Sequence, residues 1–207
     1  MGLIPHQTPV IPVVSWHEQV ESLAKIETGT MKKIILTIII VLVIQALALF
    51  IFIFSGAYNV STSNHDSGFV NWWLATSATR SVKHHARGIR VPQLDNPAMV
   101  QEGFKHFNEM CVECHGAPGK PPGEIAKGLW PPAPDLSMAA SDWTPAQLFW
   151  ITKNGIKFSA MPGWGTTHSD EKIWAMTAFI EKLSKLSAAD YHQMETNTVG
   201  GEPSHEH

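Results

Sequence analysis

The feature that most restricts the fold of this chain is an uninterrupted apolar stretch near its N-terminus. From Ile34 to Phe54 it runs for 21 residues, and Thr37 and Gln45 are its only polar members. A helix of this length spans about 30 Å, the thickness of the hydrocarbon core of a bilayer. The stretch is apolar on every side, whereas a helix at the surface of a globular protein has one apolar face. We therefore expect a transmembrane helix over residues 34–54.

Basic residues flank this stretch on one side only. Lys32 and Lys33 precede it directly, and the next Lys or Arg is Arg80. The positive-inside rule then predicts that residues 1–33 are cytoplasmic and that everything after Phe54 is exported. The expected location is the bacterial inner membrane, crossed once, with the C-terminal part in the periplasm.

A cleaved signal peptide is the alternative interpretation of the same stretch. Met31 resembles a translation start, and residues 55–57 (Ser-Gly-Ala) resemble a small-residue cleavage site. The apolar run is longer than the usual core of a signal peptide, about 7–15 residues, which favours an uncleaved anchor. Residues 1–30 carry a capping-box pattern at Ser15 and Glu18, typical of a helix start, but also suit a tail upstream of the true start.

Residues 55–95 form a polar linker followed by a juxtamembrane segment, which could be helical over residues 69–88. Trp72 and Trp73 lie at one end of this segment and six basic residues at the other: Arg80, Lys83, His84, His85, Arg87 and Arg90. Such a pattern is typical of a helix on an anionic membrane surface or against a partner subunit. Packing of the tryptophans on the domain is the alternative. An exposed basic face explains the two histidines more simply than a metal site.

Helix signals then recur through residues 96–186. Asn96 followed by proline predicts one helix start, Thr144 followed by proline and glutamine predicts another, and that second helix should end at Gly155. A last helix should begin near Ser169, with two acidic residues in its first turn. No strand-like alternation occurs, so we expect an all-α domain. Its roughly 90 residues are few for a hydrophobic core alone, which suggests that something else fills its centre.

The two cysteines of the chain lie in one motif, Cys111-Val112-Glu113-Cys114-His115. This C-x-x-C-H sequence is the attachment signature of haem c: two thiols one helical turn apart bond the haem vinyl groups, and the histidine binds the iron. A zinc site would need further ligands that this chain does not offer at a suitable spacing. A thioredoxin-like pair would need a βαβ context, and a structural disulfide would leave His115 unexplained. We therefore expect one covalently bound haem c.

Haem iron takes a second axial ligand, and Met161 is the best candidate. It lies in a Gly- and Pro-flanked loop between two predicted helices, where a methionine has no helix face to fill. Met110, Met138 and Met176 fit the role of core filler better. His168 is the second candidate ligand.

Residues 96–186 resemble a class I, mitochondrial-type cytochrome c, closest to the monohaem domains of bacterial respiratory complexes. The resemblance rests on Gly103 and Phe107 before the haem motif, the motif itself, the Pro-Pro-Ala-Pro-Asp-Leu run at 131–136, and Met161-Pro162. It does not extend to residues 1–57 or to the basic segment with the tryptophans.

The resemblance implies His115 and Met161 as axial ligands and an N-terminal helix that crosses the C-terminal one. In this sequence the crossing would bring Gly103 and Phe107 against Trp174 and Ala178. It also implies that a backbone carbonyl of residues 131–134 accepts the ring N–H of His115. The whole chain would then be a class I cytochrome c fold preceded by one transmembrane helix, with residues 187–207 as a flexible polar tail.

Together these features predict a membrane-anchored electron-transfer protein rather than an enzyme by itself. It would carry single electrons on the periplasmic side, as carrier for or subunit of a respiratory or photosynthetic complex, with other redox proteins as partners and no small organic substrate. An apolar pocket, for which Trp130, Phe149, Trp150, Phe158 and Trp164 are candidates, would raise the reduction potential. The net charge of −3 argues against nucleic-acid binding.

Two other functions remain as alternatives. The first is a haem enzyme or gas sensor, in which Met161 is not bound and the iron keeps an open sixth site. The second is metal handling by the tail, where His192, His205 and His207 lie among polar residues.

Overall fold

The computed structural model describes residues 15–64 and 67–199, which fall into two compact units. Unit 1 comprises residues 1–59 and unit 2 comprises residues 60–207. Each unit is described by itself.

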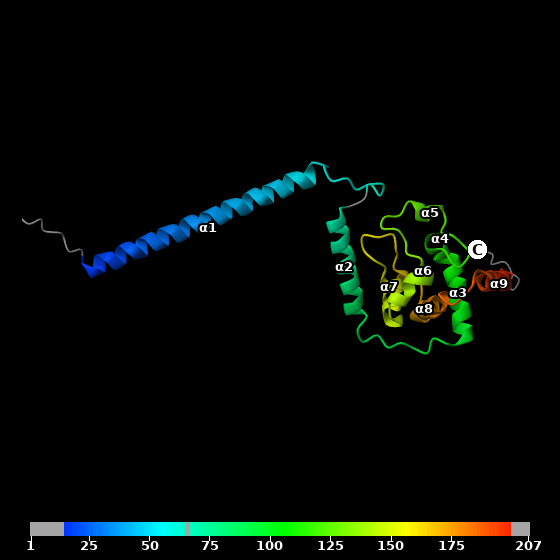
Figure 1. Ribbon diagram of the computed structural model, residues 1–207. Coiled ribbons are helices and arrows are strands. Elements are labelled where there is room, and N and C mark those ends of the chain that lie inside the picture. Colours follow the sequence, from blue (N-terminus) through cyan, green and yellow to red (C-terminus); the bar gives the residue numbers. More distant parts are fainter. Residues whose placement is uncertain (1–14, 65–66, 200–207) are drawn as a thin grey trace, which may run out of the picture. The chain divides into compact units, whose positions relative to one another are not determined.

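Unit 1 is built on one long helix, α1 (Trp16–Phe54) (Figure 1). The predicted capping box starts it: the Glu18 N–H donates to Ser15 Oγ at 3.4 Å, and the Ser15 N–H donates to the Glu18 carboxylate at 3.1 Å. The apolar side chains from residue 34 to residue 54 are exposed. Over Thr28–Phe54 the helix is long and apolar enough to cross a membrane, which makes it the candidate membrane-spanning helix predicted from the sequence.

The described part of unit 2 is helical and contains no strand. Its α-helices are α2 (Gly68–His85), α3 (Pro97–Met110), α4 (Val112–His115), α5 (Glu124–Lys127), α6 (Leu136–Ala139), α7 (Pro145–Asn154), α8 (Asp170–Leu183) and α9 (Ala188–Val199), with 3-10 turns η1 (Ala140–Asp142) and η2 (Trp164–Thr166). The helix starts predicted at Asn96, Thr144 and Ser169 are confirmed as N-caps. The Thr144 cap is a full capping box with Gln147, and α7 ends before Gly155 as predicted.

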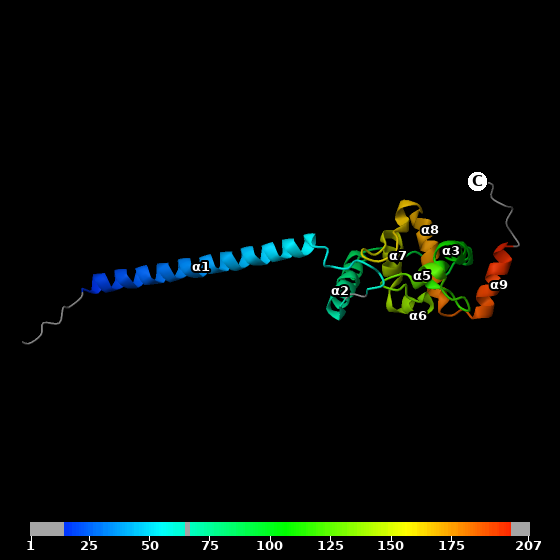
Figure 2. The same ribbon diagram turned by 90° about the horizontal axis from the view of Figure 1, so that it is seen from above.

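The centre of unit 2 is the crossing of α3 and α8, which the views in Figures 1 and 2 both show. The two backbones meet at Gly103, where a Cβ would overlap the carbonyl oxygen of Ala175 and lie 3.0 Å from the Cβ of Phe179. The crossing itself agrees with the prediction, but it is centred one residue later than Trp174 and Ala178. Trp174 instead stacks on Phe149, with ring centroids 4.0 Å apart.

The methionines predicted as core residues differ in how deeply they are buried. Met176 is fully buried and Met110 packs against both core clusters, as expected of core filler. Met138 is 71 % exposed on the short helix α6, so the prediction that it fills the core is wrong. Leu136 is the residue of this helix that packs against the core.

Helix α9 corrects a second expectation. Residues 188–199 are not a flexible tail but a helix, and its Tyr191 is only 1 % exposed within the main core cluster. The ring of Tyr191 contacts Phe104 edge to face at 5.4 Å. Burial of this aromatic ring explains why a mostly polar segment is ordered. The tail histidines at 205 and 207 lie outside the described residues.

Candidate functional site

The two cysteines lie where α3 ends and α4 begins. The backbone N–H groups of Cys114 and His115 both donate to the carbonyl of Cys111, at 3.1 and 2.9 Å, so the five-residue motif forms one helical turn. Both thiols are free; Cys111 is buried and Cys114 is half-buried. Burial, with a smaller contribution from Cys114, raises the pKa of Cys111 to about 12. The thiol of Cys111 is therefore protonated at neutral pH.

His115 is held in one orientation by a hydrogen bond from its ring. Its Nδ1 donates to the carbonyl oxygen of Pro134 at 2.7 Å. This is the carbonyl contact expected from residues 131–134, and it leaves the Nε2 lone pair available for a metal. Burial lowers the pKa of His115 more than the Pro134 and Asp135 contacts raise it. The neutral ring is thus favoured, as an iron ligand requires.

The chain that follows His115 turns back tightly on itself. Ala117 and Lys120 exchange two backbone hydrogen bonds of 2.8 Å, and the Gly123 N–H donates to the Glu113 carbonyl at 2.8 Å. A cavity of about 360 Å³ opens beside His115; its lining residues are Gly116, Ala117, Gly119, Lys120, Pro121, Pro122, Ala133 and Asp135.

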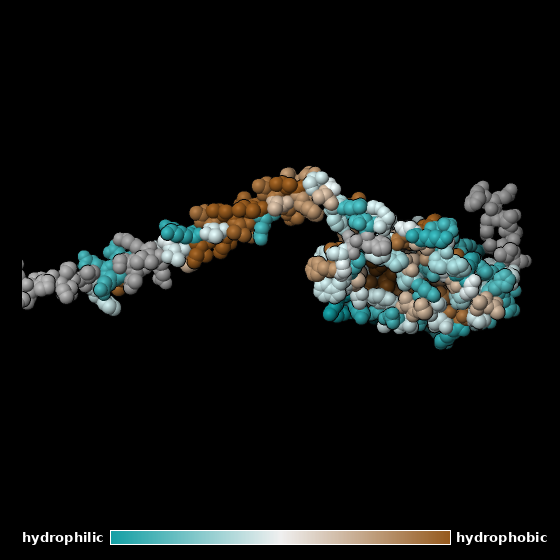
Figure 3. Space-filling model, turned by 45° about the horizontal axis from the view of Figure 1, so that its top comes forward, coloured by the Kyte–Doolittle hydropathy of each residue, from teal (hydrophilic) through white to brown (hydrophobic). Residues whose placement is uncertain are grey.

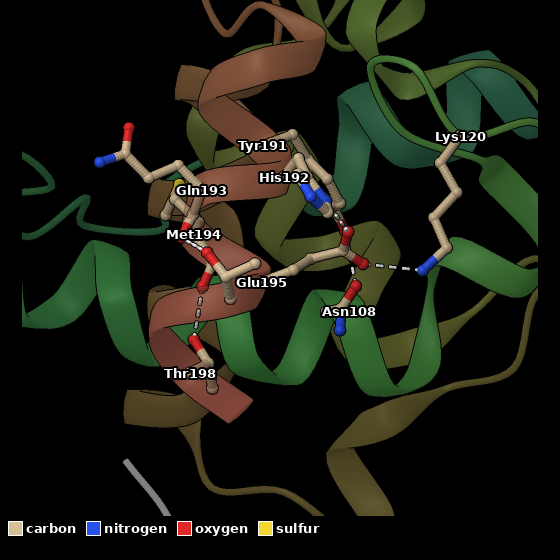
Figure 4. A network of polar contacts seen from close by, with 9 residues as sticks. Asn108, Lys120, Tyr191, His192, Gln193, Met194, Glu195 and Thr198 are labelled. Atoms are coloured by element: carbon tan, nitrogen blue, oxygen red, sulfur yellow. Dashed lines mark hydrogen bonds and ion pairs between the residues drawn. The ribbon is translucent and has the colours of Figure 1, made fainter. Parts of the chain in front are cut away.

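Helix α9 is tied to this loop and to α3. Lys120 Nζ lies 2.8 Å from the Glu195 carboxylate, and the Tyr191 hydroxyl donates to the side chain of Asn108 at 2.9 Å (Figure 4). A Cβ on Gly119 would lie 2.6 Å from the Cβ of Ala188. The sequence reasoning missed α9, although Ser187 and Asp190 at its start carry a capping pattern that could have revealed it.

Met161 lies on a different segment, the loop between α7 and η2. The loop closes on itself because the Ile156 N–H donates to the Met161 carbonyl at 3.2 Å and the Met161 N–H donates to Ser159 Oγ at 3.2 Å. Gly155 permits this closure: its φ is +68°, and a Cβ there would lie 2.6 Å from the Met161 carbonyl oxygen. An ion pair of 2.6 Å between Lys153 and Asp170 joins α7 to the start of α8 beneath the loop.

The second candidate ligand, His168, lies just after η2 and packs against two neighbouring rings. Its ring lies edge to face with Trp164 and with His106, at centroid distances of 5.6 and 5.3 Å. Its Nδ1 is hydrogen-bonded to the hydroxyl of Thr167 at 2.9 Å.

Apolar surface near these segments is open to solvent. Figure 3 shows that the face of unit 2 turned toward the viewer is hollowed, with hydrophobic residues on the floor of the hollow. Three large apolar side chains on the segments after the haem motif are more than half exposed: Ile125, Met138 and Phe158. Phe158 also has a φ of +60°. Exposed apolar side chains on these segments are consistent in chemistry with an apolar macrocycle such as haem.

The donor set fits haem better than a bare metal ion. Within residues 15–64 and 67–199, no three His, Cys, Asp or Glu side chains come together in a group that could hold a metal ion. The residues that could bind haem are therefore Cys111, Cys114 and His115 on one turn, with Met161 on a separate loop.

Comparison with known proteins points to the same class. Residues 98–180 match the model of the family described as "Cytochrome C oxidase, cbb3-type, subunit III". This match shows that unit 2 contains a c-type cytochrome domain, a class of electron-transfer protein, and such a domain implies haem c. No curated protein matches the chain.

Proposed function

We propose that this protein is a single-pass, membrane-anchored monohaem cytochrome of class I that transfers one electron at a time on the periplasmic side. The observation that carries the proposal is the haem motif on one helical turn with the Nδ1 of His115 fixed by Pro134 at 2.7 Å. The family match over residues 98–180 supports it. By itself the protein would catalyse no reaction on a substrate, although it can serve an oxidoreductase complex as a subunit.

Each site residue has a distinct role in this proposal. Cys111 and Cys114 would hold the haem through thioether bonds, and His115 Nε2 and the Met161 sulfur would bind its iron. Bound haem supplies one-electron redox chemistry between ferric and ferrous iron. The chain fixes the imidazole through the Pro134 carbonyl, positions the methionine through the closed loop, and keeps water away with its apolar side chains. Methionine ligation and exclusion of water both raise the reduction potential.

The membrane is the second part of the proposal. The apolar helix from Thr28 to Phe54 supports an anchor, and Lys32 and Lys33 at its N-terminal side support a cytoplasmic N-terminus. Partners would then be subunits of a membrane complex, such as a quinol-oxidising complex or a terminal oxidase. An alkaline phosphatase reporter fused after residue 199 should be active in bacterial cells, and the same reporter fused before residue 16 should be inactive. The reverse pattern would overturn the orientation.

Haem attachment and ligation can be tested on the purified full chain. The pigment should resist extraction by acidified acetone, and the reduced protein should not bind carbon monoxide. Met161→Ala should keep the pigment but bind carbon monoxide, since it opens the sixth position. Met138→Ala is the matched control, because it removes an exposed methionine outside that loop. Binding of carbon monoxide by the unaltered protein would instead establish a haem enzyme or gas sensor with an open site.

A further inference from the structure

Helix α2 has one face against the domain and one face in solvent. Val82 is 1 % exposed and Ala86 at its C-cap 6 %, and the ring of His85 stacks on Trp150 at a centroid distance of 5.7 Å. These contacts place α2 beside α7, as Figures 1 and 2 show. The opposite face of α2 has no role in the proposed haem site.

The solvent face combines aromatic and cationic side chains. At 100° per residue, five exposed side chains fall within a sector of about 100° on this helix. They form what we call the aromatic–basic face: Phe69, Trp72, Trp73, Arg80 and Lys83. The three aromatic side chains are 72, 62 and 56 % exposed, and the rings of Phe69 and Trp72 lie 5.9 Å apart. The sequence of α2 contains no Asp or Glu.

This distribution suits a lipid surface better than a protein partner. Tryptophan rings favour the depth of the lipid headgroups, and Arg and Lys favour anionic phosphate. Phe69 and Lys83 are about 21 Å apart along the axis, so a helix lying flat can place both groups at the same depth. A protein interface instead has an apolar centre inside a polar rim, and its centre is poor in lysine.

The chain length before α2 gives an independent reason. Only residues 55–67, 13 residues, separate the end of α1 at Phe54 from the start of α2 at Gly68. A fully extended segment of that length spans at most about 45 Å. If α1 spans a bilayer, as proposed above, α2 stays within reach of that bilayer's surface at all times.

We propose that the aromatic–basic face of α2 docks on the anionic phospholipid surface and holds the cytochrome unit against the membrane. This inference rests on the proposed membrane anchor but not on haem ligation. Docking would restrict how the cytochrome unit can turn and would keep it at the height of membrane partners. Electron transfer between the cytochrome unit and its membrane partners would then occur through a limited set of orientations.

The test uses the full-length holoprotein in vesicles of phosphatidylcholine with and without phosphatidylglycerol. A nitroxide label on Thr76→Cys reports the middle of the face, because residue 76 follows Trp72 by one helical turn. A label on Gln193→Cys, an exposed position on α9, is the control. The rate at which the label collides with oxygen, which is enriched in lipid, is compared with its collision rate with a water-soluble nickel complex. The ratio tells whether the label lies in lipid or in water. The haem spectrum of each variant checks that it is folded.

If α2 docks, the label at position 76 should collide mainly with oxygen in anionic vesicles, and the label at position 193 should collide mainly with the nickel complex. Trp72→Ser with Trp73→Ser should abolish the lipid signal. Lys83→Glu should weaken docking roughly fivefold or more, since each basic residue near an anionic surface contributes about that factor. The control Lys127→Glu, on α5, should change nothing.

Three results would overturn the proposal, and they differ in what else they affect. In the first, the label at position 76 collides mainly with the nickel complex in every vesicle while the protein still co-floats with the vesicles. That result rejects docking and leaves the anchor intact. Protection at position 76 only in native membranes assigns the face to a protein partner instead. Failure of the protein to float with vesicles rejects both docking and the anchor.

Discussion

The two sides of the proposed haem site are built very differently. The side with Cys111, Cys114 and His115 is part of a helical turn, is fixed by the Pro134 carbonyl, and is continuous with the core around Phe107. The side with Met161 is a loop whose hydrogen bonds are largely to itself, through Ile156 and Ser159.

This difference separates two tasks of a cytochrome. Attachment of a cofactor needs rigid covalent positions on elements that form with the core, whereas tuning its potential needs only one correctly placed side chain. We therefore expect damage to the cysteine–histidine side to affect the whole domain. Damage to the methionine side should be local and should leave the fold intact.

The largest effect should follow from removing both thiols. Cys111→Ala with Cys114→Ala leaves no thioether bond, so any remaining pigment should be extracted by acidified acetone, and the domain should lose much of its core stability. The check is the covalent haem content and the yield of full-length protein in membranes. Ser184→Ala, outside the motif, is the control. Retention of acetone-resistant pigment would contradict the assignment of these cysteines.

Gly103→Ala should have the next largest effect, because it acts on the crossing of α3 and α8 next to the cysteine side. The added methyl group would overlap the Ala175 carbonyl, so α3 and α8 must separate. We expect a loss of about 3 kcal/mol or more in the free energy of unfolding. Denaturant unfolding of the holoprotein measures it. Gly68→Ala is the matched control, since nothing lies within 4 Å of a Cβ at that position; equal effects of the two changes would show that the crossing tolerates separation.

Gly155→Ala tests the methionine side in the same way. Its φ of +68° costs a residue with a side chain about 1–2 kcal/mol, and the methyl group would press on the Met161 carbonyl. Because the loop can shift without moving the core, we expect carbon monoxide to bind the reduced protein while covalent haem is retained and the free energy of unfolding falls by only about 1–2 kcal/mol. A loss of stability as large as that of Gly103→Ala would contradict the contrast between the two sides.

The sequence predicted the residues of the candidate site more completely than the helices around it. Three features are local patterns with one main physical cause each: the haem motif, the capping signals and the apolar stretch. Each could therefore be predicted from the residues alone. Met138 and α9 could not, because their positions depend on packing. On α6 it is Leu136 that packs against the core while Met138 is exposed, and α9 is ordered by the burial of one ring, Tyr191, in a core formed by distant residues.

A smaller effect is expected from Tyr191→Phe, which tests how α9 supports the cysteine side. The change keeps the buried ring and removes only the hydrogen bond to Asn108. Loss of one such bond costs about 1 kcal/mol, and the unpaired Asn108 side chain can turn toward water. Denaturant unfolding should show this loss without any change in the haem spectrum. Tyr191→Ala should cost several times more, and similar values for both would mean that the ring contributes little.

The smallest effect should be a pH dependence that comes from His168. Burial, followed by the nearby His106 and Lys172, lowers the pKa of His168 from its ordinary value of 6.5, whereas the Trp164 backbone and Glu109 raise it less. The folded state therefore binds fewer protons than the unfolded state, and stability is lost as the pH falls from about 6.5 toward the lowered pKa. His168→Gln should flatten the slope of unfolding free energy between pH 7 and about 5 while leaving stability at pH 8 nearly unchanged. Because the Trp164 turn leads from the Met161 loop into α8, an unchanged slope would show that protonation of His168 is accommodated without strain on the methionine side.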